Sequence, residues 1–208
     1  MHVVVFGANG KVGSIVVAKL LENGHRVTAF VYGRNSFRAH PKLTMFQGNV
    51  KQASDVQQAL KGAEAVISTL GSWGTKTKDI LATGMQVIIP AMQSQGVSRI
   101  VSLTGSAAQA PHDHWGITSK LSRQLLVLVA PKILKDGEDH IQLLNKSTLD
   151  WTVVRSPIMN ELGNDTYSLT SKLPGLFETI NRHAVAQAII DQLEDDTFIC
   201  QAPHIHRK

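Results

Sequence analysis

Three glycines stand three residues apart near the N-terminus: Gly7, Gly10 and Gly13, within VVVFGANGKVG at 3–13. A β-branched run precedes them and apolar residues at helical spacing follow, so the pattern predicts a strand, a tight turn and a helix. In such a loop Gly7 permits the turn, Gly10 lets the backbone approach a pyrophosphate, and Gly13 lets the helix pack close to the sheet. The helix N-terminus then favours the phosphates. The loop predicts a dinucleotide site, with the spacing G-x-x-G-x-x-G in place of the commoner G-x-G-x-x-G.

The end of the second expected strand, at 26–32, bears on the choice between NAD and NADP. An NAD site usually carries an acid there, which bonds the ribose 2′-OH. Here no acid is present and Arg34 follows. An acid would repel a 2′-phosphate, whereas an arginine can hold it. We expect NADP(H), with Arg34 as the first candidate for the phosphate and Arg38 as the next; alternatively, Arg34 is a solvated loop residue.

Strands and helices alternate along the chain. Strands are expected at 2–6, 26–32, 43–49, 63–71, 98–106, 149–157 and 197–202. Helices are expected at about 12–23, 52–61, 78–95, 118–130, 137–146 and 183–193, with a kink or break at Pro90. This alternation predicts one α/β domain over 1–208, a Rossmann-type doubly wound parallel sheet. The irregular polar segment 158–182 follows the sixth strand, and because ligands lie beyond strand carboxyl ends, we expect it to cover the substrate.

The composition excludes several classes of protein. The chain of 208 residues is 43% hydrophobic and 18% charged, as in an ordinary globular protein. Without an apolar run of membrane-spanning length or a signal-peptide pattern, and with Cys200 as the single cysteine, we expect a cytoplasmic protein and no membrane partner. The net charge of +5 is scattered, so no nucleic acid is expected. The His-x-His pairs at 112–114 and 204–206 lack a third ligand, and Cys200 lies in an expected strand, so we expect no metal. We also expect a monomer or a weak homodimer.

Several motifs resemble those of the atypical short-chain dehydrogenases/reductases. G-x-x-G-x-x-G after the first strand is typical of them, and FQGNV at 46–50 is similar to their G-D-V, with Asn49 replacing Asp. LDWTVVRSP at 149–157 resembles LDWTIVRPP of the NAD(P)H-binding, NmrA-like branch. EDHI at 138–141 resembles the D-D-H-I of small NADPH-flavin reductases, a group that includes biliverdin-IXβ reductase. The similarity covers about residues 1 to 202.

The resemblance implies a Rossmann domain with NADP across the strand ends. Carried over by position, the cofactor-binding residues are Gly7, Asn9, Gly10, Lys11, Val12 and Gly13 at the pyrophosphate, Asn49 and Val50 at the adenine, Leu70 and Gly71 on the ribose side, and Thr104, Gly105, Ser106 and Pro157 near the nicotinamide. The change to Asn49 is mild, because an amide can still bond to an adenine amine.

The usual catalytic pair of that family is missing. Most members use Tyr-x-x-x-Lys to protonate a carbonyl as hydride arrives, but Tyr32 and Tyr167 are followed four residues later by Ser36 and Ser171. A flavin or quinone delocalises the incoming charge and takes its proton from water, so its site needs mainly orientation. We therefore expect hydride transfer from NADPH to a flavin, quinone or similar small planar acceptor. The alternative is a non-catalytic NADP(H)-binding redox sensor of the NmrA-like type.

Ser106 and His140 are the candidate catalytic residues. Ser106 could hydrogen-bond an acceptor oxygen or the nicotinamide amide, or it could be a turn hydroxyl bonded to backbone. His140 could act as an acid near neutral pH, or it could be a surface histidine on a helix. Lys120 is a weaker candidate for a displaced catalytic lysine. Trp73 could stack on adenine or on a substrate ring, or pack in the core.

Overall fold

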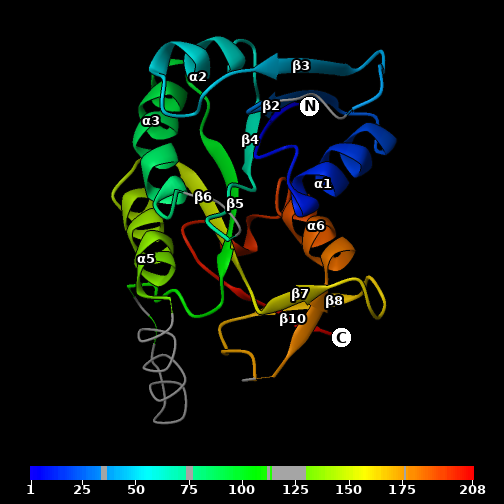
Figure 1. The fold of residues 1–208 in the computed structure, drawn as a ribbon, viewed down its shortest axis with the longest axis vertical. Coiled ribbons are helices and arrows are strands. Elements are labelled where there is room, and N and C mark those ends of the chain that lie inside the picture. Colours follow the sequence, from blue (N-terminus) through cyan, green and yellow to red (C-terminus); the bar gives the residue numbers. More distant parts are fainter. Residues whose placement is uncertain (34–36, 74–76, 112, 114–129, 176) are drawn as a thin grey trace.

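A computed structural model of the chain describes residues 1–33, 37–73, 77–111, 113, 130–175 and 177–208 (Figure 1). An eight-stranded sheet has the order β3-β2-β1-β4-β5-β6-β10-β8. Its strands are β1 (His2–Phe6), β2 (Arg26–Val31), β3 (Leu43–Gln47), β4 (Ala65–Ser68), β5 (Arg99–Gly105), β6 (Asp150–Ser156), β8 (Tyr167–Thr170) and β10 (His204–Arg207). Neighbouring strands are parallel except β8 and β10, which are antiparallel. The expected α/β, doubly wound parallel sheet is confirmed.

Helices cover both faces of this sheet (Figure 1). One face carries α1 (Lys11–Glu22) and α6 (Arg182–Asp191); the other carries α2 (Ala53–Ala59), α3 (Ile80–Ser94) and α5 (Pro131–Asn145). In β1, Val3 and Val5 pack on the α1 side, whereas Val4 and Phe6 pack on the α3 side. Burial on both faces explains why the strands read as continuous apolar runs.

The segment 158–182 contains three short strands. β7 (Ile158–Asn160) and β9 (Thr179–Asn181) form a separate parallel pair, and β8 joins the main sheet beside β10. The sequence reading of this segment as irregular was therefore incomplete. Because His204 of β10 is level with Arg155 near the end of β6, β10 and β8 extend past the carboxyl edge of the parallel strands. We call residues 158–182 the cover segment.

Three expected elements need correction. Residues 197–202 do not form a strand: a 3₁₀ turn spans Asp196–Phe198, Cys200 has φ of +56°, and the last strand comes later, in β10. The Asp195 side chain accepts the Thr197 N–H and so begins the turn.

No break occurs at Pro90, where α3 continues. α5 starts six residues before the expected 137, with Pro131 in its first turn, where the missing N–H costs nothing. The helix expected at 118–130 lies almost entirely outside the described residues.

Candidate functional site

The glycine loop lies beside the point where the strand order reverses, between β1 and β4. Gly7 follows β1 with φ of +77°, a left-handed conformation that favours glycine. The Gly10 N–H donates to the Gly7 carbonyl at 2.9 Å and closes the turn, and α1 begins at Lys11. Among the described residues no side chain caps α1, and its first turn holds no acid. Its first N–H groups are therefore available to an anion such as a pyrophosphate.

Two of the three glycines are required by the fold itself. A Cβ on Gly13 would clash with the Gly7 carbonyl and lie 2.7 Å from Thr69 Oγ1, and a Cβ on Gly7 would lie 2.8 Å from the Thr69 backbone. A Cβ on Gly10 would meet only the Gly7 oxygen, at 3.1 Å. The described structure therefore has little need for glycine at position 10. A group that approaches from outside, as a pyrophosphate does, explains it better.

The other predicted residues of this loop differ in exposure. Asn9 and Lys11 are exposed beside the loop, so their side chains can contact a ligand. Val12 is buried in the core cluster on the α1 side, so only its backbone N–H can serve the pyrophosphate.

Aromatic packing shapes the predicted adenine side, at the ends of β2 and β3. Phe30 and Phe46 stack with ring centroids 5.4 Å apart. The Asn49 Oδ1 accepts the Lys51 N–H at 3.0 Å, and its own N–H donates to Asp55 Oδ2 at 2.9 Å. Asn49 is thus held in a turn, and its Oδ1 keeps a second lone pair that can accept the predicted hydrogen bond from an adenine amine. Val50 is buried.

Of the two arginines predicted to hold the 2′-phosphate, the structure describes only one. Arg34 lies outside the described residues, and Arg38 is exposed. The assignment of the 2′-phosphate therefore stays a prediction.

The loop after β4 is tied to α5 by a buried carboxylate. Asp136 is 3% exposed and accepts hydrogen bonds from the Ser72 hydroxyl and from the N–H groups of Leu81, at 3.2 Å, and Ala82, at 2.8 Å. It therefore caps the N-terminus of α3 from another helix. Sequence reasoning missed this residue.

The predicted ribose-side residues precede Ser72 in this loop. Leu70 is half-buried and packs on the α3 cluster, and Gly71 is exposed in open space. Trp73 is 71% exposed, which rules out core packing and leaves stacking on a ligand ring as its predicted role.

The predicted nicotinamide residues lie at the ends of β5 and β6. The Thr104 side chain is buried against α5, where a Cβ on Gly137 would lie 2.6 Å from its hydroxyl, so only its backbone can border a cofactor. Gly105 is exposed and Ser106 is half-buried. The Ser106 N–H donates to the Ser156 carbonyl at 2.8 Å, which places Ser106 beside the buried Pro157.

His140 does not lie where either sequence interpretation placed it. Its ring is 1% exposed, on the face of α5 that packs against β5, and Nε2 lies 2.9 Å from the Ser102 hydroxyl. Burial lowers the pKa of His140 to about 3, so the imidazole is neutral at neutral pH. This placement argues against the predicted acid role, and it corrects the surface alternative. The helical spacing of His140 with Ile141 and Leu144 signalled a buried face.

Neither tyrosine replaces the missing catalytic acid. The Tyr167 hydroxyl, in β8, donates to Asp191 of α6. Burial and this carboxylate raise the pKa of Tyr167 well above its ordinary value. Tyr32 is 79% exposed just after β2, beside the predicted adenine end. In the described structure the Tyr167 hydroxyl is therefore engaged by Asp191, and Tyr32 stands at the end of β2 rather than of β5.

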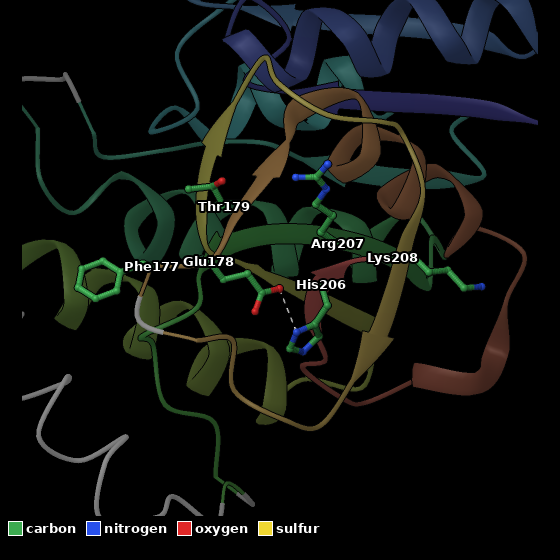
Figure 2. Close-up of a pocket in the computed structure, with 6 residues that line it drawn as sticks. All are labelled: Phe177, Glu178, Thr179, His206, Arg207 and Lys208. Atoms are coloured by element: carbon green, nitrogen blue, oxygen red, sulfur yellow. Dashed lines mark hydrogen bonds and ion pairs between the residues drawn. The ribbon is translucent and has the colours of Figure 1, made fainter.

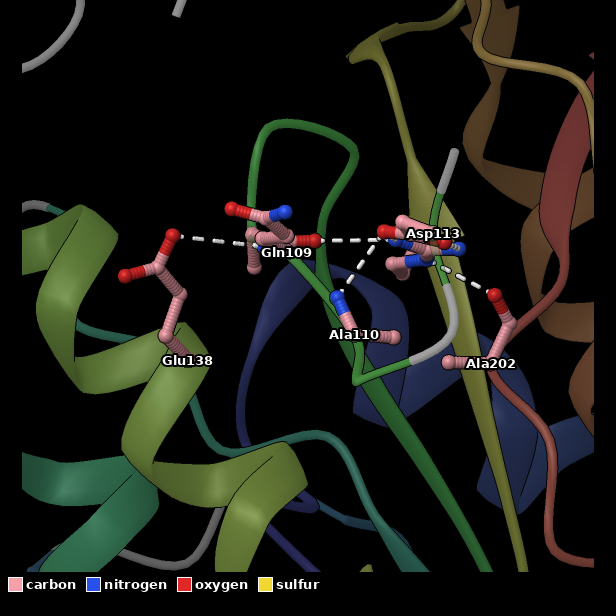
Figure 3. Close-up of polar contacts among 7 residues, drawn as sticks. Gln109, Ala110, Asp113, Glu138 and Ala202 are labelled. Carbon is pink, nitrogen blue, oxygen red and sulfur yellow. Dashed lines mark hydrogen bonds and ion pairs between the residues drawn. The ribbon is translucent and has the colours of Figure 1, made fainter. Parts of the chain in front are cut away.

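A buried ion pair, also missed from the sequence, lies beside the nicotinamide residues. Arg155 of β6 is 2% exposed and pairs with Asp113 in the loop that follows β5. Figure 3 shows this loop, with Ala110 and Gln109 approaching the carboxylates of Asp113 and Glu138, respectively. The motif LDWTVVRSP contained the arginine, but nothing in the pattern indicated its partner.

A shallow hollow of about 600 Å³ opens beside the cover segment (Figure 2). It is lined by Phe177, Glu178, Thr179, His206, Arg207 and Lys208. His206 Nδ1 lies 3.1 Å from Glu178 Oε1, and Nε2 lies 2.9 Å from the Lys172 carbonyl. The hollow does not include the glycine loop, so it is separate from the predicted pyrophosphate site.

Among the described residues, no group of three or more histidine, cysteine or acidic side chains is arranged to hold a metal ion. None of the described helices combines the length and the apolar character needed to cross a bilayer.

The fold and the glycine loop define a Rossmann-type dinucleotide-binding protein. The chain matches the NAD(P)H-binding family over residues 7–196, and it belongs to that family. Over 112 residues it is 32% identical to a 3-beta-hydroxysteroid dehydrogenase of Mycolicibacterium neoaurum, a match that covers 48% of this chain and 31% of that protein. The chain thus matches about a third of the length of this curated relative.

Solved structures share the fold over the whole chain. A short-chain dehydrogenase/reductase from Veillonella parvula in complex with NADP has a TM-score of 0.78 at 18% identity, covering 99% of this chain and 94% of that one. ChuY, described as an anaerobilin reductase from Escherichia coli O157:H7, has a TM-score of 0.78 at 18% identity, covering 99% and 97%. At this level of identity the likeness shows the fold.

Proposed function

We propose that the protein is an NADPH-dependent oxidoreductase that reduces a flavin, a quinone or another small planar conjugated molecule. Membership of the NAD(P)H-binding family supports the nucleotide. The lack of an acid after β2, together with Arg34, supports NADP over NAD. The motif resemblance to the NmrA-like branch and its small flavin reductases supports the acceptor class.

The observation that supports the acceptor class is exposed apolar surface on the cover segment, which begins two residues after the strand residue that bonds the Ser106 N–H. Among the described residues, the exposed large apolar side chains are Met1, Tyr32, Trp73, Ile158, Leu162 and Phe177, three of them in the cover segment. Ser106 bonds to Ser156, two residues before Ile158, and β7 pairs Ile158 with Thr179, two residues after Phe177. Apolar and aromatic side chains near one hydroxyl suit a flat ring that needs orientation more than acid catalysis.

Each part of the site then has a defined task. Bound NADPH supplies the hydride. The first turn of α1 holds the pyrophosphate through backbone N–H groups, and Gly10 leaves room for it. The Ser106 hydroxyl orients the acceptor oxygen or the carboxamide. The cover segment shields the acceptor face from water, and a conjugated acceptor takes its proton from solvent, so no tyrosine is needed.

The test is oxidation of NADPH, followed by its absorbance, with FMN, riboflavin, quinones and a linear tetrapyrrole as acceptors. The tetrapyrrole is included because it is a conjugated molecule and because ChuY, which shares the fold, is described as an anaerobilin reductase. An aliphatic ketone is the matched control. We expect turnover with at least one planar acceptor and none with the ketone. Binding of NADPH without reduction of any acceptor would refute the proposal.

A non-catalytic redox sensor is the second candidate, favoured by the same missing Tyr-x-x-x-Lys pair and by the exposed Trp73 and Phe177. Such a sensor binds NADP(H) and a protein partner, and its partner affinity changes with the redox state of the nucleotide. Pull-downs with oxidised and reduced cofactor distinguish it: equal capture in both states counts against it. The cytoplasmic location and the monomer or weak homodimer stay predictions.

A further inference from the structure

Arg155 is bonded through all three guanidinium nitrogens at the carboxyl edge of the sheet. Nε donates to the Ala202 carbonyl at 2.7 Å, Nη1 to the Ala108 carbonyl at 3.0 Å and to Asp113 Oδ2, and Nη2 to Asp113 Oδ1 at 2.8 Å. One side chain therefore joins β6 to two other segments, the loop after β5 and the approach to β10. Figure 3 shows Asp113 and Ala202, which lie on different segments of the chain, close together at this contact.

Asp113 extends the contact to a second point on the loop. Its side chain is 11% exposed, and Oδ2 also accepts the Ala110 N–H at 2.8 Å. The ion pair thus fixes one carbonyl and one N–H of the loop, two residues apart. The Ser106 N–H adds a third attachment, to the carbonyl of Ser156, which follows Arg155 directly. The loop that carries Ser106 takes its position from β6 through these contacts.

A buried ion pair is a poor source of stability, because its desolvation offsets much of the attraction. A second buried arginine, without a carboxylate partner among the described residues, lies at the amino ends of the parallel strands. Arg99, at the start of β5, is 8% exposed and donates to the carbonyls of Asp150, at 2.7 Å, and Gln192, and to Thr152 Oγ1 at 3.0 Å. Arg99 joins strands and the C-terminal region far along β5 from Ser106. The two arginines therefore differ in position and in partners: Arg155 pairs with the Asp113 carboxylate, whereas Arg99 bonds to carbonyl and hydroxyl oxygens.

We propose that Arg155 is a positioning residue, which acts through Asp113 to hold the loop after β5, and with it the Ser106 hydroxyl, in the geometry that orients the acceptor. This inference rests on the proposed function for its effect on turnover. The glycine loop is built on β1, β4 and α1, away from the hydrogen bonds of Arg155, so the pyrophosphate contacts, which should supply most of the affinity for NADPH, do not depend on Arg155. Misplacement of a reacting group by about 1 Å can cost roughly a hundredfold in rate.

The experiment compares Arg155→Lys with Arg99→Lys, and adds Asp113→Asn as a milder change that keeps one acceptor oxygen. A lysine keeps the charge but cannot make the forked contacts. We expect both lysine variants to lower the melting temperature. Only Arg155→Lys and Asp113→Asn should speed hydrogen exchange of the amides at 106–110, by about tenfold or more, because the ion pair no longer fixes the Ala108 carbonyl and the Ala110 N–H and the loop opens more often.

Kinetics supply the functional half of the test. In Arg155→Lys, kcat/KM for the acceptor should fall by about ten- to a hundredfold while the Kd for NADPH stays within about twofold. Unchanged exchange at 106–110, or an equal kinetic loss in Arg99→Lys, would overturn the inference. If the wild-type protein binds NADPH but reduces no acceptor, the proposed function fails separately, and the exchange data still decide whether Arg155 holds the loop.

Discussion

The glycine loop allows a sharp separation of fold from cofactor binding. Gly10 has φ of −69° and ψ of 165°, values that alanine adopts without strain, and a Cβ there would meet only the Gly7 carbonyl at 3.1 Å. A methyl group should therefore change the free energy of unfolding by no more than about 1 kcal/mol, with reduced chain entropy partly offsetting a poorer N-cap. The same methyl would stand where the pyrophosphate approaches the N–H groups of α1.

The expected loss of affinity follows from those hydrogen bonds. Each hydrogen bond to a charged oxygen contributes about 1.5–3 kcal/mol, so displacement of one by Gly10→Ala weakens NADPH binding by roughly ten- to a hundredfold. Isothermal titration calorimetry measures the Kd, and urea unfolding measures the stability of the same sample. Gly13→Ala is the comparison: its Cβ clashes with the Gly7 carbonyl, so stability should fall by about 2 kcal/mol or more. A folded Gly10→Ala protein with wild-type affinity would refute the reasoning.

Three further predictions concern single side chains. Arg34→Ala should weaken NADPH binding by about tenfold and leave NADH binding unchanged, because only NADPH carries the 2′-phosphate; equal losses for both nucleotides would contradict this assignment. Asp136→Ala should lower the free energy of unfolding by about 2–4 kcal/mol, because it removes the acceptor for the Ser72 hydroxyl and two N–H groups at α3. Urea unfolding of this variant checks it, and a loss below about 1 kcal/mol would count against the cap. His140, with its pKa lowered from 6.5 to about 3, stays neutral when folded but takes up a proton when unfolded, so it removes about 1.4 kcal/mol of stability per pH unit as pH falls from 6.5 towards 3. His140→Gln should reduce this acid dependence, and equal slopes in the two proteins would show that His140 is not neutral in the fold.

The parallel sheet could be predicted because its strands are buried on both faces, and continuous apolar runs such as HVVVF identify them directly. The C-terminus could not be read in this way. TFICQA has the composition of a strand, but Asp195 caps a turn there and Cys200 takes a positive φ. The true last strand, β10, contains His204, which is buried, and His206, which is half-buried, and the burial of such polar residues depends on tertiary neighbours.

In the candidate site, too, residues whose roles depend on nearby sequence could be predicted, whereas residues with partners far away in the chain could not. The roles of Gly7 and Gly13 depend on local spacing and on their close approach to neighbouring backbone, so the motif sufficed. The burial of His140 could have been read from helical periodicity. The partners of Asp136 and Arg155 are 42 to 64 residues away in the chain, and spacing carries no information about them. Long-range polar contacts of this kind require the structure.

The proposed function depends on transfer of hydride from bound NADPH to a planar acceptor. The most direct measurement is anaerobic stopped-flow absorbance on mixing the NADPH complex with FMN, a quinone or a linear tetrapyrrole. We expect NADPH oxidation and acceptor reduction to proceed together, one for one, at a rate that Gly10→Ala lowers at subsaturating cofactor. Persistence of NADPH in the complex with every acceptor, while binding is intact, would contradict it.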